Sequence, residues 1–533
     1  GETMFTARPV RRRLACFNGH IRAIAAAHRA RLMDLERGGP MDPRLFHPDR
    51  LHANPLGHER IALAAVAALG LPGADDAWQH PLPPLAGARL HLLGIGGRGL
   101  APLAAAAASL GADVTGCDPG GFPFSGVLLR DLGIVPDTRH DPAHLDDGRE
   151  LVATASARTD DPEVEAARSA GRLHRRMDLT AAVMAARQGV GVSGSHGKGT
   201  VAALAAASAR AAGLDPMPVL GVHVAELGGA FHAGSGPSVV EVDGSDLAAH
   251  FVACDVATVT NLDDDHPHLP VSVAEEAASV GGFVERARTH VILGPSPRRE
   301  LLARRARVPV WRIGVDVAAR VVAQRDEGAV VRIDGPEGER VEALVRLVGP
   351  ATATNAALAY ASARALGAGA EAAAHGLAAI DRLDRRLEPL GRHRGVWVYD
   401  DFGGKHPAAV REGLLALRRR HPRARVIAVF EPLFGATIRT WGWRYARALR
   451  LADVPIVLPT MEHPDYPSTS DPALRDWYLQ CGDGVLSAAS QAEAASLAAE
   501  RARPGDVVVG FVQMTRRGTD LAAAIIAALD HPA

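Results

Sequence analysis

Lysine is almost absent from this chain. Of its 59 lysines and arginines only two are lysines, Lys198 and Lys405, and asparagine is nearly as rare. Where arginine serves as the general surface cation, a retained lysine indicates a position that needs a compact ammonium group instead of a planar guanidinium. Lys198 lies in a glycine-rich loop, so both lysines, and Lys198 above all, are candidate functional residues.

Cysteine, net charge and long apolar runs are also scarce. The four cysteines lie far apart, at Cys16, Cys117, Cys254 and Cys481, which excludes a CxxC metal site and makes a disulfide framework unexpected. The net charge of −1 gives no basic field that would attract nucleic acid or an anionic membrane. No apolar run approaches the ~20 residues of a membrane span, and no signal-peptide pattern follows Gly1. We therefore expect a cytoplasmic chain with no nucleic-acid partner and no membrane insertion.

The composition that remains is that of a globular protein, with 47% hydrophobic and 22% charged residues over 533 positions. At ~150 residues per domain, this length predicts several domains. Buried-strand patterns that lead through a glycine turn into a helix begin at Leu90 and Gly189, and a further α/β region begins near Gly395. We therefore predict an α/β fold, interrupted by short Val-rich strands between Gly314 and Val348.

The first glycine turn follows the strand at Leu90 and opens a helix. Glycines in such a turn let the backbone approach a pyrophosphate, and the helix N-terminus offers free N–H groups. An aspartate about 20 residues later, at the end of the next strand, can bind a ribose hydroxyl. The pattern favours a nucleotide ligand over a tight turn without one. The candidate residues are Gly94, Gly96, Gly97, Gly99 and Asp118.

The second glycine turn is a short phosphate loop. It follows the strand Gly189–Ser193 and precedes a helix expected over Val201–Ala212. In this context backbone N–H groups cradle phosphate oxygens, and the lysine reaches the terminal phosphates as a point charge. The hydroxyl that normally follows the lysine and binds Mg²⁺ is displaced by one position. The predicted ATP-binding residues are Gly194, Ser195, His196, Gly197, Lys198, Gly199 and Thr200.

Acidic residues follow two apolar strands that we expect beside this loop. One strand ends at Glu241, and the next ends in an acidic cluster, Asp263–Asp265, followed by His266. Carboxylates with one imidazole suit Mg²⁺ better than structural zinc, which prefers closed sites of Cys and His. We therefore predict Glu241, His266 and Thr200 as magnesium ligands. The alternative for Asp263–Asp265 is a solvated acidic loop.

With these motifs in place, residues 88–533 resemble the Mur ligases, ATP-dependent enzymes that add amino acids or peptides to UDP-N-acetylmuramic acid in peptidoglycan synthesis. The first glycine turn is similar to the UDP-binding loop of the L-alanine-adding branch, and GSHGK is similar to the family's ATP loop. EVDGSD from Glu241 resembles the EADESD segment, and TNLDDDH from Thr260 resembles TNxxxDH. The resemblance implies adenine binding by Asn355. It also implies catalytic roles for Lys198, His266, Arg386, Asp401, Lys405 and His406.

The resemblance implies three domains. They are a Rossmann-like UDP-sugar-binding domain over 86–187, a P-loop ATPase-like central domain over 188–384 and a Rossmann-like C-terminal domain over 385–533. Residues 1–85 resemble instead the last block of SGNH (GDSL-type) esterases, where Asp49 and His52 match the acid and base of a Ser-His-Asp triad. The block with the nucleophilic serine is missing, so we expect a vestigial pair in a truncated fusion or a remnant.

Four departures from the family pattern touch the ATP or transfer site. Gly199 replaces a Thr or Ser, Gly244 replaces the second Glu of EADESD, and Ala351-Thr352 replace His-Asn. The segment that resembles the family's DDYxHHP motif carries an extra residue and reads GGKH over residues 403–406. No lysine lies between residues 199 and 404, so the carbamylated lysine of some Mur branches is absent.

The activity implied by the resemblance is joining of L-alanine to UDP-N-acetylmuramate through an acyl-phosphate, with ATP and Mg²⁺. One alternative is a recycling ligase that attaches a whole peptide to the same sugar nucleotide. Another, suggested by the departures, is a degenerate nucleotide-binding protein without turnover. The sequence leaves the oligomeric state open.

Overall fold

The computed structural model describes residues 82–531, apart from 121–124, 155–156, 159, 245–248, 264–272, 326, 348, 350, 385, 402–405, 433–434, 461–476, 483 and 512–520. The predicted residues Asp49, His52, His266 and Lys405 lie outside the described residues. The chain divides into two compact units, which are described separately: residues up to Ala186 with a short later segment, and the remainder.

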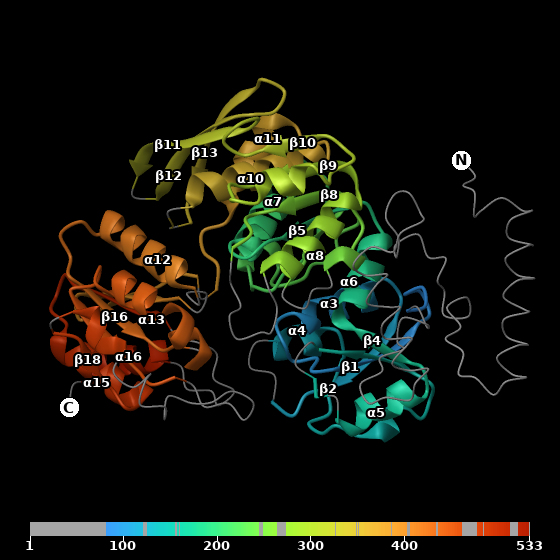
Figure 1. Cartoon of the computed structure of the whole chain (residues 1–533), viewed down its shortest axis with the longest axis horizontal. Coiled ribbons are helices and arrows are strands. Elements are labelled where there is room, and N and C mark those ends of the chain that lie inside the picture. Colours follow the sequence, from blue (N-terminus) through green and yellow to red (C-terminus); the bar gives the residue numbers. More distant parts are fainter. Residues whose placement is uncertain are drawn as a thin grey trace, which may run out of the picture. The chain divides into compact units, whose positions relative to one another are not determined.

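A four-stranded parallel sheet in the order β2-β1-β3-β4 forms the centre of the first unit (Figure 1). The predicted strand, glycine turn, helix and second strand are confirmed. The strands are β1 (Arg89–Leu93), β2 (Asp113–Cys117), β3 (Glu150–Ala153) and β4 (Leu173–Arg175). The helices are α3 (Leu100–Ser109), α4 (Gly126–Asp131), η3 (Pro142–Leu145), α5 (Pro162–Ser169) and α6 (Arg176–Ala185).

The second unit begins with a six-stranded parallel sheet in the order β10-β9-β8-β5-β7-β6. β5 lies at its middle with every residue buried, and the chain turns to opposite sides of it for β7 and β8. The carboxyl end of such a strand is where open α/β sheets bind ligands. The strands are β5 (Gly189–Ser193), β6 (Met217–Val219), β7 (Ser238–Glu241), β8 (Cys254–Val259), β9 (Ala287–Leu293) and β10 (Val310–Arg312).

Alanine-rich helices cover this sheet. α7 and α10 pack on each other through small buried side chains, which let two helices approach closely. The helices of this part are α7 (Lys198–Ala211), η4 (Ala225–Leu227), α8 (Val273–Glu285), α9 (Arg299–Ala303), α10 (Thr352–Ala365), α11 (Ala370–Gly376) and η6 (Leu377–Ala379). The short helix η5 (Ala249–Phe251) lies mostly in the segment that belongs to the first unit. The predicted Val-rich excursion is an antiparallel sheet beside α10 and α11, formed by β11 (Ala318–Arg325), β12 (Gly328–Asp334) and β13 (Arg340–Val345).

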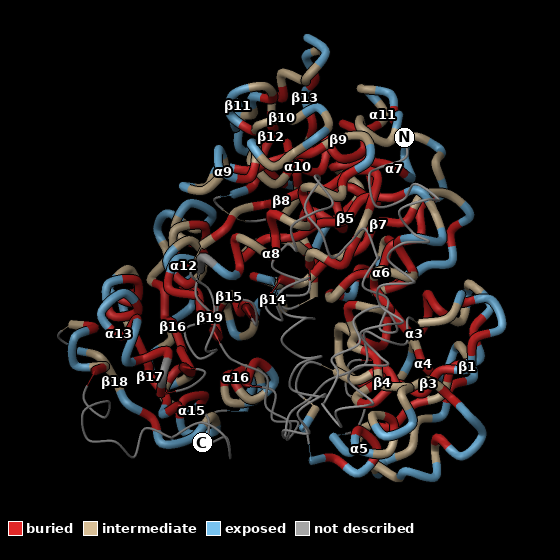
Figure 2. Tube along the Cα trace, turned by 45° about the vertical axis from the view of Figure 1, so that its right-hand side comes forward, coloured by how far each residue is buried: buried red, intermediate tan, exposed pale blue. Residues whose placement is uncertain are grey.

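The rest of the second unit is built on a sheet in the order β14-β15-β19-β16-β17-β18, in which only β14 is antiparallel to its neighbour. Along β16, Val426, Ala428 and Phe430 pack on one face and Ile427 and Val429 on the other, so both faces are buried (Figure 2). The strands are β14 (Glu388–His393), β15 (Val396–Asp400), β16 (Val426–Phe430), β17 (Val454–Val457), β18 (Leu486–Ser487) and β19 (Val507–Phe511). The helices are α12 (Pro407–Arg420), α13 (Gly435–Leu449), η7 (Trp477–Cys481), α15 (Gln491–Arg501) and α16 (Leu521–Asp530).

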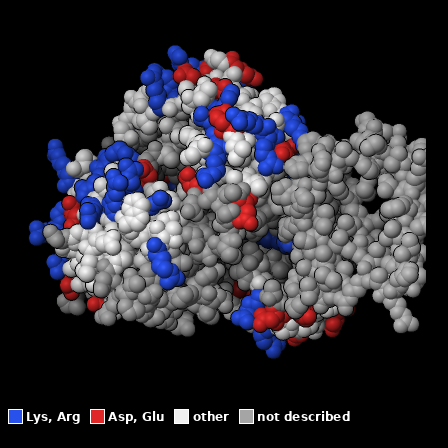
Figure 3. Space-filling view, in the orientation of Figure 1, with Lys and Arg blue, Asp and Glu red and all other residues white. Residues whose placement is uncertain are grey.

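Basic side chains gather over α12 (Figure 3), whose last turn carries Arg418, Arg419 and Arg420. Cations at this end complement the negative end of the helix dipole. Among the described residues, no helix is both long and apolar enough to cross a membrane.

Two of the differences between predicted and observed element boundaries concern the phosphate loop. α7 begins at Lys198 instead of Val201, because Gly197 takes a left-handed conformation (φ +81°) that lets the helix begin at the lysine. β8 ends at Val259 instead of continuing to the acidic cluster at Asp263, because Thr260 and Asn261 leave the strand to bind the loop.

Candidate active site

The phosphate loop lies at the carboxyl end of β5 and needs glycine at two positions. Gly194 has φ +125°, and a Cβ added there would lie 2.3 Å from Thr260 Oγ1. Gly197 is the left-handed residue that precedes α7, so the backbone turns sharply between the strand and the helix. The N–H groups of the first turn of α7 and the positive end of its dipole are therefore presented at the loop.

Side chains from the end of β8 hold the loop in this shape. Asn261 Oδ1 accepts from His196 N at 2.9 Å, and its Nδ2 donates to His196 O at 3.0 Å. Thr260 Oγ1 donates to the same carbonyl at 2.6 Å, and Ser195 Oγ bonds to the backbone of Asp263. Sequence reasoning missed Thr260 and Asn261 as loop-holding residues. The rarity of asparagine was the available signal, since Asn261 and Asn355 both lie at this loop.

Lys198 is half-buried and its side chain folds back over the loop. Its ammonium group donates to Gly194 O at 2.8 Å and to Ser195 O at 3.3 Å. These carbonyls hold the charge over the loop, where it can meet a phosphate. An ammonium group with three donors suits such a compact position.

Asn355 and Glu241 approach the loop from α10 and β7. Asn355 Oδ1 lies 3.2 Å from the position of a Cβ added at Gly197. Glu241 Oε2 accepts from Gly221 N at 3.1 Å and lies 3.3 Å from a Cβ added at Gly199. The structure thus brings two of the predicted ligand-binding side chains to the start of α7. Asn355 lies beside Gly197, and Glu241 lies beside Gly199.

Three predicted catalytic residues after position 384 are described by the structure, and one of them, His406, contacts the phosphate loop. Asp401 is buried directly after β15, and its N–H donates to Gly510 O at 2.9 Å. His406 Nδ1 accepts from Ala408 N at 3.2 Å, so the ring caps α12, and its centroid lies 4.7 Å from that of His196 in the phosphate loop. Arg386 is exposed.

In the first unit, Asp118 fastens the glycine turn instead of standing apart from it. Its Oδ2 accepts from Gly96 N at 3.1 Å and its Oδ1 from Gly120 N at 2.8 Å. Sequence reasoning also missed Arg176, whose Nη1 lies 2.9 Å from the position of a Cβ added at Gly99. A guanidinium beside this turn is suited to bind phosphate oxygens.

Glu431, at the end of β16, is a buried carboxyl whose burial raises its pKa to about 7, although Gln491 Nε2 donates to it at 3.0 Å. The folded state therefore favours the protonated form. The free energy of unfolding should fall as the pH rises from about 4.5 to about 7, and the full penalty, roughly 3 kcal/mol, applies above that. Glu431→Gln should raise the melting temperature at pH 8 and leave it nearly unchanged at pH 4. An equal shift at both pH values would contradict a titrating Glu431.

Comparison with known proteins places the chain in a family. The family profile described as "Mur ligase family, catalytic domain" matches residues 89–188, and "Mur ligase, glutamate ligase domain" matches residues 385–511. A UDP-N-acetylmuramate–L-alanine ligase of Kineococcus radiotolerans is 36% identical over 440 residues, which are 79% of this chain and 92% of that relative.

Solved structures agree in fold. A UDP-N-acetylmuramate-alanine ligase from Thermotoga maritima matches with a TM-score of 0.66 at 19% identity, covering 82% of this chain and 97% of that one. A murein peptide ligase from Psychrobacter arcticus matches with a TM-score of 0.64 at 20% identity, covering 84% and 100%. With the identity of the Kineococcus relative over nearly its whole length, these findings show that the chain belongs to the Mur ligase family.

Proposed function

We propose that this chain is an ATP-dependent ligase that joins L-alanine to UDP-N-acetylmuramate in peptidoglycan synthesis, with release of ADP and phosphate. The observation that carries the proposal is the phosphate loop at the end of β5, with Lys198 folded over it and Asn355 and Glu241 beside it. The name of the Kineococcus relative supports this choice of substrates.

The chemistry that such a site supports is activation of a carboxylate by phosphoryl transfer. A muramate carboxylate oxygen attacks the γ-phosphorus of ATP, the bond from that phosphorus to the bridging oxygen breaks, and ADP leaves. The amine of L-alanine then attacks the acyl carbon, and the bond to the phosphate oxygen breaks as the amide forms. Both steps depend on positioning and on neutralisation of charge.

The donors beside the loop fit a magnesium ion. The Glu241 carboxylate supplies hard oxygen atoms and lies over the first turn of α7, next to position 199. Glu241, Thr200 and His266 would hold the ion, which when bound neutralises charge on the phosphates of ATP. Lys198 and the loop N–H groups bind the same phosphates directly.

The C-terminal residues complete the proposed site. Arg386 and Lys405 would supply positive charge to the acyl-phosphate, and Asp401 and His406 would orient the reacting groups. The contact of the His406 ring with His196 of the phosphate loop supports this assignment for the segment that contains Lys405.

Gly199 offers a test of the metal assignment. A hydroxyl added at this position would lie beside Glu241, so Gly199→Ser should lower the Mg²⁺ concentration needed for half-maximal activity. The family pattern allows Thr or Ser here. Any side chain brings its Cβ to 3.2 Å from Val222 Cγ1, so Ser is preferred to Thr, which would add a methyl group as well as the hydroxyl. Gly199→Ala is the control, since it stiffens the helix without adding a ligand. If Ala lowers the requirement as much as Ser, the missing-hydroxyl account is wrong.

ADP release measured with UDP-N-acetylmuramate plus either L-alanine or a free peptide tests the proposed function. The proposal predicts release that depends on the sugar nucleotide and on L-alanine together. Release only with the peptide would favour the recycling ligase. No release with either amine would indicate a Mur-like protein without turnover.

A further inference from the structure

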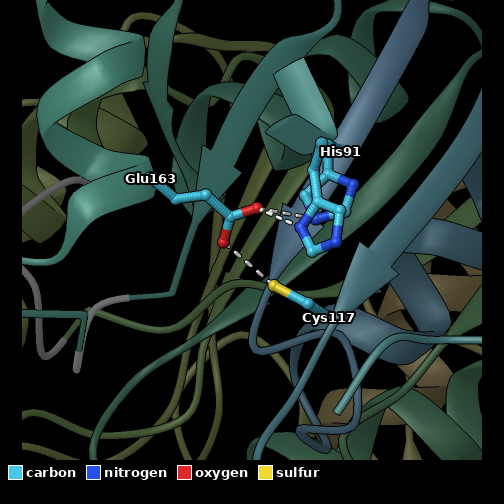
Figure 4. A group of neighbouring side chains, drawn as sticks. His91, Cys117 and Glu163 are labelled. Carbon is cyan, nitrogen blue, oxygen red and sulfur yellow. Dashed lines mark hydrogen bonds and ion pairs between the residues drawn. The ribbon is translucent and has the colours of Figure 1, made fainter. Parts of the chain in front are cut away.

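A cluster of metal-ligating side chains lies in the first unit, on the face of the sheet that η3 and α5 cover. His91 comes from β1, Cys117 from the end of β2, His144 from η3 and Glu163 from the first turn of α5. One ligand atom from each of the four lies within 4.8 Å of all the others. Figure 4 shows the Glu163 carboxylate pointing between the His91 ring and the Cys117 sulfur. The proposed ligase site uses none of these residues.

The Glu163 carboxylate is the centre of the cluster and is completely buried. Its Oε2 lies 3.1 Å from Cys117 Sγ, and its Oε1 lies 2.7 Å from His144 Nδ1 and 3.1 Å from His91 Nε2. The register of β1 and β2 explains how His91 and Cys117 come together. His91 pairs with Thr115 and Leu93 pairs with Cys117, so the side chains of these two pairs lie on the same face of the sheet.

His91 is not satisfied by this arrangement. Its side chain is 3% exposed, and Nε2, although close to Glu163, lacks the alignment of a hydrogen bond and has no other partner among the described residues. A buried imidazole nitrogen without a hydrogen bond is costly, so native structures rarely leave one. This nitrogen points into the cluster, where an ion would give it a partner.

Both histidines already have the outer partners that a metal-bound imidazole needs. His91 Nδ1 lies 2.8 Å from Thr115 Oγ1, and His144 Nε2 lies 3.4 Å from Asp137 Oδ2. A proton on each of these outer nitrogens leaves the inner nitrogens, Nε2 of His91 and Nδ1 of His144, free to bind an ion. Such outer hydrogen bonds to a hydroxyl or carboxylate are the usual support of metal-binding histidines.

We propose that His91, Cys117, His144 and Glu163 form a structural zinc site in the UDP-binding part of this ligase. Two imidazoles, one thiolate and one carboxylate are ligand types that zinc accepts in a tetrahedral site, and the two anions balance its charge. The thiol proton leaves when the ion binds. A tetrahedral zinc site separates its ligand atoms by roughly 3.3–3.7 Å. The contacts of Glu163, at 2.7 and 3.1 Å, therefore need to widen by roughly half an ångström, and any pair near the 4.8 Å limit of the cluster needs to move closer together.

The ion would tie together four elements and support the glycine turn. The Cys117 carbonyl accepts from Gly94 N at 2.8 Å, and the next residue, Asp118, accepts from Gly96 N. His144 is partly exposed, with 19% of its side chain accessible, and so gives the ion a way in. The site therefore stabilises the base of the predicted UDP-binding loop without contacting a substrate.

Zinc content and cobalt spectra of the full-length chain test the proposal. We expect purified protein to retain zinc, and protein reconstituted with Co²⁺ to show thiolate-to-cobalt charge-transfer bands. Cys117→Ser should lose these bands, while Cys481→Ser, which removes another buried thiol, should keep them. Neither readout depends on ligase activity. Absence of metal binding, or bands that persist in Cys117→Ser, would overturn the site.

A second variant guards against a change that merely unfolds the protein. Thr115→Val keeps the size of the side chain but removes the acceptor of His91 Nδ1, and it should weaken zinc binding by roughly 10–100-fold. A melting curve with and without a chelator accompanies the titration. The proposal is wrong if Thr115→Val binds zinc as tightly as the parent and the chelator lowers the melting temperature of neither protein. The cluster is then a hydrogen-bonded network without an ion.

Discussion

Lys198→Arg should reduce ADP release by a factor on the order of 10²–10³ and leave the melting temperature nearly unchanged. The Lys198 ammonium lies 2.8 Å from Gly194 O and 3.3 Å from Ser195 O, inside the curve of the loop. A planar guanidinium is larger and cannot direct three donors from one atom, so it should displace the phosphates instead of binding them. Steady-state ADP release with saturating substrates measures the loss.

Arg210→Lys is the matched control, because it makes the reverse exchange at the exposed end of the same helix. It should leave both rate and stability as they are. Activity of Lys198→Arg close to that of the parent would contradict the role assigned to this lysine.

Asn261→Asp should lower kcat/KM for ATP by roughly 100-fold, since juxtaposed like charges cost several kcal/mol. The change keeps the acceptor for His196 N but removes the donor to His196 O. It also places a negative charge against a carbonyl and beside a loop that binds phosphates. The loop should therefore open and repel the nucleotide, and KM for ATP should rise.

Gln188→Glu adds the same charge at the exposed opposite end of β5 and should have little effect on KM. Comparison of the two variants separates local repulsion from a change in net charge. An unchanged KM for ATP in Asn261→Asp would show that the asparagine does not shape the nucleotide site.

The strands and the phosphate loop were predictable because their signals are local. The five residues of β5 are all buried and lead into the loop, where Gly194 and Gly197 have backbone angles that glycine adopts most readily. The Val-rich sheet β11-β12-β13 was likewise visible as short strands between turns. The Rossmann-like and P-loop ATPase-like character of the domains came from the family resemblance, and the order of their strands was not predicted.

Contacts between distant residues could not be predicted. The hold of Asn261 on His196 spans 65 positions, and that of Glu163 on Cys117 spans 46. No local pattern records which strand ends meet. The sequence therefore showed Asn261 only as a rare asparagine within the TNLDDDH segment, without its bonds to the loop, and the cysteines were judged by their spacing alone. Asp118 shows the reverse case, because its position was predicted but its bonds to the glycine turn were not.

The most direct test of ligation through an acyl-phosphate follows one oxygen atom. UDP-N-acetylmuramate labelled with heavy oxygen in its carboxylate is incubated with ATP, Mg²⁺ and L-alanine, and the released phosphate is analysed by mass spectrometry. The account predicts that each turnover transfers one carboxylate oxygen to phosphate and leaves the other in the amide. Phosphate without the label, formed while ADP accumulates, would contradict it.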